Sequence, residues 1–112
     1  MSSRVADAPR QATVFAALCD PTRLALVTRL CRDAPCSIAQ LASASPLTRQ
    51  AITKHLRVLE GAGIVRAETI GRERVFELKT EPLAAAQSYL HTIAQQWDAA
   101  LARLQAFVEK ES

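Results

Sequence analysis

Five polar side chains have the types and the spacing to form hydrogen bonds with nucleic-acid bases: Arg49, Gln50, Thr53, Lys54 and Arg57. Arginine and lysine can pair with guanine, and glutamine with adenine, through two atoms of the base edge. At about 100° per residue, all but Arg49 lie on the side of a helix opposite an apolar stripe of Ile52, Leu56 and Leu59. Each could instead contact only phosphate, which positions a protein on DNA without reading the sequence.

The positive charge of the chain is concentrated around this segment. Residues 48–74 contain six basic and three acidic side chains, whereas the rest of the chain contains eight of each. The formal net charge of +3 therefore belongs to this stretch. A local excess of positive charge beside hydrogen-bonding side chains favours a polyanionic partner, and double-stranded DNA fits both features.

A hairpin with arginines near its tip follows the basic helix. Residues 64–69 and 74–78 alternate apolar and charged side chains around the turn Ile-Gly-Arg-Glu, which predicts two strands. We expect Arg72 and Arg74 to contact backbone phosphate or the minor groove. Arg66, at the base of the hairpin, is a weaker candidate for the same contact.

The basic helix has a defined beginning and end in the sequence. Thr48 can cap its first amides, and Gly61 and Gly63 supply a stop. Thr48, and Ser45 before it, could also offer a hydroxyl or a helix-terminal amide to phosphate. This segment fits the recognition helix of a helix-turn-helix, with a short support helix before the turn.

Two helices are predicted ahead of that turn. Asp20 can cap free amides and Pro21 suits a first helical position, so a helix begins there. Ser37 and Gln40 have the spacing of a capping box, which starts the short support helix.

Residues 82–109 predict a long final helix with one apolar face. The stripe consists of Leu83, Ala86, Leu90, Ile93, Ala94, Trp97, Leu101, Leu104 and Val108. A face this apolar is unfavourable in water, so we expect it to pack on the first helix and on its own copy in a homodimer. Trp97 is better explained as dimer core than as part of a ligand cage.

Length and composition indicate one mainly α domain over residues 1–112. Residues 1–9 are small and polar, so we expect them to be disordered, with a first helix starting at Arg10.

No apolar run approaches the roughly 20 residues that span a bilayer, and the start lacks a secretory signal, which favours the cytoplasm. None of the common nucleotide-binding, hydrolase or metalloprotease motifs occurs, so no catalytic residues and no cofactor are predicted.

The cysteines allow an alternative function. Cys31 and Cys36 flank the turn CRDAPC and could bind a soft metal ion or form a redox switch. They could equally be small buried apolar residues. Cys19 lies about 18 Å from Cys31 along a helix, too far to share an ion or a disulfide within one chain.

The histidines offer weaker candidates for a metal site. His91 and Asp98 stand about 10 Å apart along the final helix, so they cannot hold one ion within a chain. A site shared between two subunits remains an alternative. His55 lies at the edge of the apolar stripe and is better explained as a structural hydrogen-bonding histidine.

Three strings, FAALCDPTRLALVTRL, SIAQLA and TRQAITKHLRVLEGAGIVRAETIGRERVFEL, resemble the ArsR-type family of bacterial winged-helix regulators over roughly residues 13–80. The resemblance implies a homodimer that binds a partly palindromic operator and represses transcription. Arsenic-sensing members carry a cysteine pair on the support helix, and zinc-sensing members carry paired histidine and carboxylate ligands on the last helix. This chain has neither arrangement, and its final helix resembles a branch without a metal site.

The sequence therefore predicts a winged helix-turn-helix, mainly α, with a two-stranded β wing and a long C-terminal dimerisation helix. The predicted function is DNA-binding repression by a homodimer. Two alternatives stay open: a repressor switched through Cys31 and Cys36, and a dimeric protein-interaction module that does not bind DNA.

Overall fold

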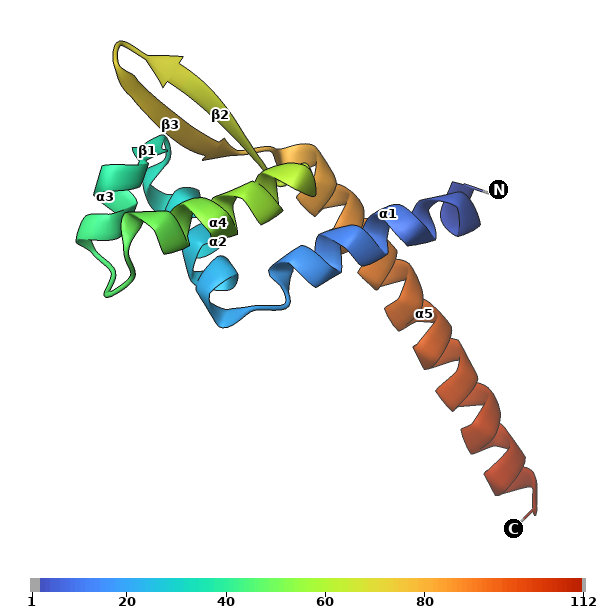
Figure 1. Ribbon diagram of the computed structural model, residues 1–112. Helices are drawn as coiled ribbons and strands as arrows, with labels where there is room; N and C mark the ends of the chain where they lie inside the picture. The colour runs from blue at the N-terminus through green and yellow to red at the C-terminus, as the bar shows by residue number, and fades with distance from the viewer. Residues whose placement is uncertain (1–2, 112) are drawn as a thin grey trace.

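The computed structural model describes residues 3–111, and the side chains from residue 8 onward. Its elements, in chain order, are α1 (Ser3–Leu18), α2 (Pro21–Asp33), β1 (Cys36–Ser37), α3 (Ile38–Ser43), α4 (Arg49–Gly61), β2 (Val65–Ile70), β3 (Glu73–Leu78) and α5 (Thr80–Glu111). Figure 1 shows α2, α3 and α4 gathered together, the β2–β3 hairpin beside them and α5 leading away. This is the predicted winged helix-turn-helix.

The first helix starts earlier than the sequence predicted. α1 begins at Ser3 instead of Arg10, so it covers most of the segment that was expected to be disordered. Residues 1 and 2 lie outside the described residues. The alanines of this segment favour helix, and α1 packs against α5, as expected for the apolar face of the last helix.

The helix caps predicted at Asp20, Ser37 and Thr48 are formed. The Asp20 carboxylate accepts hydrogen bonds from Thr22 N (2.8 Å) and Arg23 N (3.0 Å) at the start of α2. The capping box at α3 has both of its bonds, Ser37 N to Gln40 Oε1 (2.8 Å) and Gln40 N to Ser37 Oγ (3.1 Å). Thr48 Oγ1 accepts from Ala51 N (3.1 Å) and fixes the start of α4.

The end of α4 is a Schellman motif, which also sets where the wing begins. Gly63 N donates to Glu60 O, and Ile64 N donates to Leu59 O, both at 2.9 Å. Gly63 has a φ of +79°, a left-handed conformation that a side chain disfavours. These two bonds turn the backbone from α4 directly into β2.

The sheet has one strand more than predicted. Its order is β1-β3-β2, all antiparallel, with Cys36 opposite Phe76 and Ser37 opposite Val75. β1 is only two residues long, so it shows no alternation from which it could be recognised. It anchors the base of the wing to the segment between α2 and α3.

One hydrophobic core holds α1, α2, α3, α4 and the wing together. The apolar stripe of α4 lies at its centre: Ile52, Leu56 and Leu59 are each at most 1% exposed. Leu30 of α2, Leu41 of α3, Val65 of β2 and Phe76 of β3 belong to the same buried cluster. The predicted apolar side of the recognition helix is therefore confirmed, and its other side is free to face outward.

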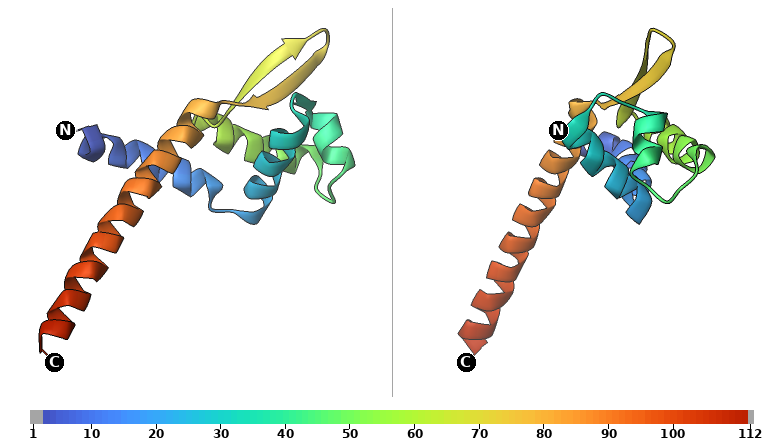
Figure 2. Two further views of the ribbon diagram at one scale, coloured as in Figure 1. Left: turned by 180° about the vertical axis from the view of Figure 1, so that it is seen from behind. Right: turned by 90° about the vertical axis from the view of Figure 1, so that its left-hand side faces the viewer.

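The long final helix leaves the core after its first turns (Figure 2). Ala86 is buried, and the Tyr89 ring lies 6.3 Å from the ring of Phe15 on α1. Farther along, large apolar side chains stay exposed, among them Trp97 (63%), Leu101 (53%) and Leu104 (59%). The helix runs over Thr80–Glu111, slightly longer than the predicted 82–109.

Candidate nucleic-acid interface

The outward side of α4 carries the side chains that the sequence singled out. Arg49, Gln50, Lys54 and Arg57 are exposed, and Thr53 is half-buried. They lie opposite the buried stripe, because α4 is one regular helix from Arg49 to Gly61. Among the side chains of residues 8–111, none forms a salt bridge with Arg49, Lys54 or Arg57.

The hydroxyls at the start of α4 are partly engaged within the protein. Thr53 Oγ1 donates to Arg49 O (2.8 Å), which leaves its oxygen as an acceptor and its methyl group for apolar contact. Thr48 Oγ1 and Ser45 Oγ instead accept backbone bonds, from Ala51 N and Leu47 N at 3.1 Å each. Each of these two hydroxyls therefore keeps its hydrogen for an outside acceptor such as phosphate.

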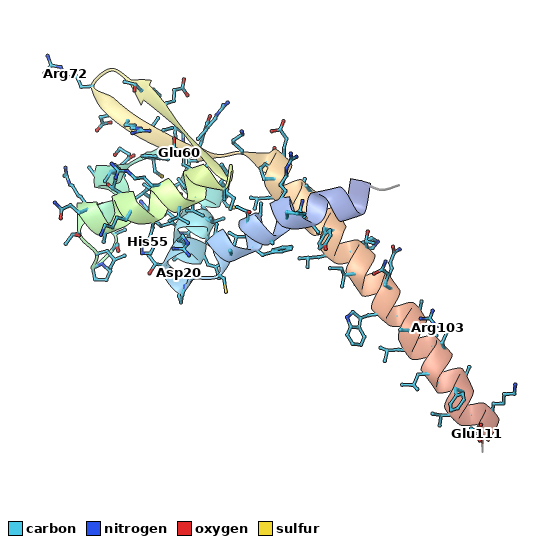
Figure 3. The ribbon with its side chains drawn as sticks, turned by 45° about the vertical axis from the view of Figure 1, so that its right-hand side comes forward. Asp20, His55, Glu60, Arg72, Arg103 and Glu111 are labelled. Atoms are coloured by element: carbon cyan, nitrogen blue, oxygen red, sulfur yellow. The ribbon has the colours of Figure 1, made fainter. Side chains whose placement is uncertain are left out.

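The wing arginines differ from one another in their surroundings. Arg72 is exposed at the tip of the hairpin (Figure 3), with no ion pair among the described residues. Arg74 points back to α4: its Nη2 lies 3.4 Å from Glu60 Oε2, and its guanidinium lies over the Phe76 ring. Arg66 is paired with Glu77 across the hairpin, with Nε 2.6 Å from Oε1. Arg72 is thus the wing cation with the most freedom to meet a polyanion.

His55 joins the recognition helix to the start of α2. Arg23 Nη1 lies 3.4 Å from His55 Nδ1, and Arg23 Nε donates to Ala17 O at 2.5 Å. Arginine can only donate, so a hydrogen bond between these two atoms uses Nδ1 of His55 as the acceptor. Figure 3 places Asp20 close to His55. The sequence indicated a structural role for His55 but did not identify Arg23 as its partner.

The cysteines lie in different environments. Cys31 is exposed on α2, whereas Cys36 is buried in β1 and its Sγ donates to Asp33 O at 3.4 Å. Burial raises the pKa of the Cys36 thiol, so little thiolate forms there at neutral pH. Across the described residues, no three His, Cys, Asp or Glu side chains gather in a way that could hold a metal ion. His91 and Asp98 are both exposed on α5.

Comparisons with known proteins agree with this geometry. A family model described as a helix-turn-helix domain matches residues 18–68. The HTH-type transcriptional regulator Rv2034 of Mycobacterium tuberculosis is 35% identical over 95 residues, which is 85% of each chain. The solved structure of an ArsR-like transcriptional regulator from Rhodococcus sp. RHA1 is 37% identical, with a TM-score of 0.79 over 88% of this chain and 92% of that one. The chain belongs to the ArsR family of transcriptional regulators. It is accordingly a DNA-binding regulator and not an enzyme.

Other ArsR-type relatives match over a shorter region. The transcriptional repressor SmtB homolog of Synechocystis is 34% identical over 71 residues, which is 63% of this chain but 53% of that protein. The cadmium metal-sensor CmtR of Mycobacterium tuberculosis has 36% identity and a TM-score of 0.55 over 63% of this chain and 73% of that one.

Among the described helices, none has the length and apolar content needed to cross a bilayer.

Proposed function

We propose that this ArsR-type regulator is a homodimeric repressor that binds a partly palindromic operator through α4 and the wing. The exposed basic side of α4, held opposite a fully buried stripe, carries this proposal. Such a helix can enter the major groove while its apolar side stays in the protein core. A bound dimer would occlude a promoter without any further chemistry, and it would act in the cytoplasm, where the DNA lies.

The roles of individual side chains follow from their positions. Gln50, Thr53, Lys54 and Arg57 would face base edges, with Arg49 and the Thr48 hydroxyl at the start of α4 close to phosphate. Arg72 would contact the DNA backbone or the minor groove beside the site. Arg74 would add a second positive charge to the same contact.

The exposed apolar side of α5 supports the homodimer. Its large side chains, Trp97, Leu101, Leu104 and Phe107, are all more than half exposed in the single chain. A continuous apolar face of this kind is typical of a protein interface, and a second copy is the simplest partner. In a two-fold dimer, the two recognition helices would lie about 34 Å apart, one turn of DNA.

The test is binding to a duplex from the region upstream of the gene, measured at several salt concentrations. If the side chain reads a base, Lys54→Ala and Arg57→Ala should each weaken binding to the operator by about 1–3 kcal/mol. If it contacts phosphate, the affinity should fall equally for all DNA sequences. The Arg72→Ala/Arg74→Ala double variant should weaken binding to all sequences and flatten the salt dependence.

Arg103→Ala is the matched control, because Arg103 is an exposed arginine on α5 (Figure 3), far from the proposed interface. Unchanged duplex binding in the Lys54 and Arg57 variants would show that α4 does not face DNA. Absence of salt-dependent duplex binding in the unmodified protein would favour the interaction module instead.

A further inference from the structure

A cavity of about 710 Å³ lies where α1, the end of α4 and the start of α5 meet. Both views in Figure 2 place the beginning of α5 against these two helices. The lining includes Gln11 and Val14 of α1, Ala62 and Gly63 after α4, and Pro82 of α5. None of the residues assigned to DNA contact lines this cavity.

Gln11 gives the cavity a specific polar group. Its side chain is buried, with only 3% of the residue exposed, and its Oε1 has no hydrogen-bond partner among the described side chains. A buried acceptor without a donor is unfavourable, and native proteins rarely leave one unsatisfied. Since Gln11 lines the cavity, a rotation of its side-chain amide would bring this oxygen to a bound molecule with an O–H or N–H group, which would supply the missing donor.

The rim of the cavity adds a positive charge. Arg10 and Lys79 are exposed cations on the lining, against one acid, Glu81. The first turn of α5 lies in the same wall, and the N-terminus of a helix favours negative charge. The remaining walls are largely apolar, with Pro9, Val14, Pro82 and Ala85 among them. The site thus combines a buried acceptor on a lining residue, apolar walls and a cationic rim.

We propose that this cavity binds a small hydroxylated carboxylic acid and that its occupancy changes the affinity for DNA. The hydroxyl would donate to Gln11 Oε1, and the carboxylate would lie near Arg10 or Lys79. Coupling follows from the lining, since Gly61, Ala62 and Gly63 form the turn that joins α4 to the wing. A ligand that fits one position of this turn better than another shifts the population of DNA-binding conformations. The regulatory part of this inference rests on the proposed function, whereas ligand binding does not.

The binding test uses the full chain, ¹⁵N-labelled, and 4-hydroxybenzoate as the probe. Saturable chemical-shift changes should centre on the amides of Ala62, Gly63 and Ala85. Two analogues test the chemistry: 4-methoxybenzoate lacks the donor, 4-hydroxybenzyl alcohol lacks the charge, and each should bind about tenfold more weakly. Absence of saturable shifts at these amides up to about 10 mM, ten times a dissociation constant of 1 mM, would overturn the proposal.

Two variants distinguish a loss of ligand binding from a loss of folding. Gln11→Leu should bind the probe at least about tenfold more weakly and melt no lower than the unmodified chain, because it removes an unpaired buried acceptor. Lys79→Glu reverses a rim charge on an exposed residue and should also weaken binding, with Lys110→Glu at the far end of α5 as its control. Unchanged probe affinity in both Gln11→Leu and Lys79→Glu would contradict the assignment. So would a Gln11→Leu chain whose only change is in dimer dissociation, since the cavity would then be a contact between two copies.

The regulatory arm measures duplex affinity with and without saturating 4-hydroxybenzoate. Coupling should change the dissociation constant by about fivefold or more, and Gln11→Leu should remove the change. Probe binding without any effect on duplex affinity would overturn the regulatory claim. If the unmodified protein fails to bind DNA while the chemical shifts persist, the proposed function fails and the ligand site stands.

Discussion

Arg74 on the wing and Glu60 near the end of α4 form an ion pair, with Nη2 3.4 Å from Oε2. The Arg74 guanidinium also lies 5.6 Å from the centre of the Phe76 ring. Both charged side chains are substantially exposed, so the pair contributes only about 0–1 kcal/mol to the free energy of unfolding. Its main effect is on the orientation of the Arg74 side chain, because it holds this cation against α4.

Glu60→Gln is therefore expected to strengthen binding to duplex DNA. The substitution frees Arg74 and removes a negative charge beside the proposed interface, so the salt dependence should steepen by about one counterion. Titrations of a labelled duplex at several salt concentrations measure this slope. Asp98→Asn, which neutralises an exposed acid on α5, is the control and should leave the slope unchanged. Weaker binding by Glu60→Gln would indicate that DNA binding requires the intact pair.

The apolar side of α5 predicts a dimer that single substitutions can dissociate. Leu101→Asp places a charge among exposed apolar side chains and should convert the protein to monomers, as should Trp97→Ala to a smaller degree. Sedimentation equilibrium measures the mass, and circular dichroism checks that the helices persist. A monomeric unmodified protein, or a Leu101→Asp variant with unchanged mass, would contradict the dimer.

The cap at Asp20 predicts a pH-dependent loss of stability. The hydrogen bond from Arg23 N is the main cause that holds the pKa of this carboxyl below its ordinary value of 3.8, against an opposing effect of burial. Its stabilising effect is thus complete above pH 3.8 and disappears as the pH falls through the lower folded-state pKa. Asp20→Ala should lower the melting temperature at neutral pH, and the gap to the unmodified protein should close in acid.

Asp20→Asn is the matched control for that experiment, because asparagine also caps helices but carries no charge. It should keep most of the neutral-pH melting temperature and show less change with pH. A gap between Asp20→Ala and the unmodified protein that stays constant down to pH 2 would show that the ionised carboxylate is not the stabilising species.

The environments of the cysteines predict an order of alkylation. Cys19 and Cys31 are exposed and should react first with iodoacetamide at neutral pH. Cys36 should react at least about tenfold more slowly, because burial raises the pKa of its thiol and limits access. Mass spectrometry of the peptides measures the order. Fast labelling of Cys36, together with oxidant-sensitive DNA binding that Cys36→Ser abolishes, would support the redox switch.

The parts of the fold that local chemistry encodes were predictable. The caps at Asp20, Ser37 and Thr48 follow from side chains that bond to amides two or three residues away. The buried stripe of α4 follows from helical periodicity, which also identified the residues on its outer side. The roles of those outer residues in DNA binding stay predictions.

The features that escaped prediction depend on contacts between distant parts of the chain. β1 is a strand because Cys36 lies opposite Phe76, and two residues alone carry no pattern. The pairing of Arg74 with Glu60 separates it from Arg72, although both looked alike in sequence. Gln11 gave no signal either, since only the packing of α1 on α5 and the end of α4 buries its side chain.

The main-chain turn at Gly63 has a consequence for how such a protein could be retargeted. Backbone bonds, rather than the outward-facing side chains, set the angle between α4 and β2, and the left-handed φ makes Gly63 hard to replace. The exposed side chains of α4 can therefore be substituted without changing the backbone that positions them. If Gln50, Lys54 and Arg57 read bases as proposed, a library randomised at these positions should vary the preferred DNA sequence and keep the fold.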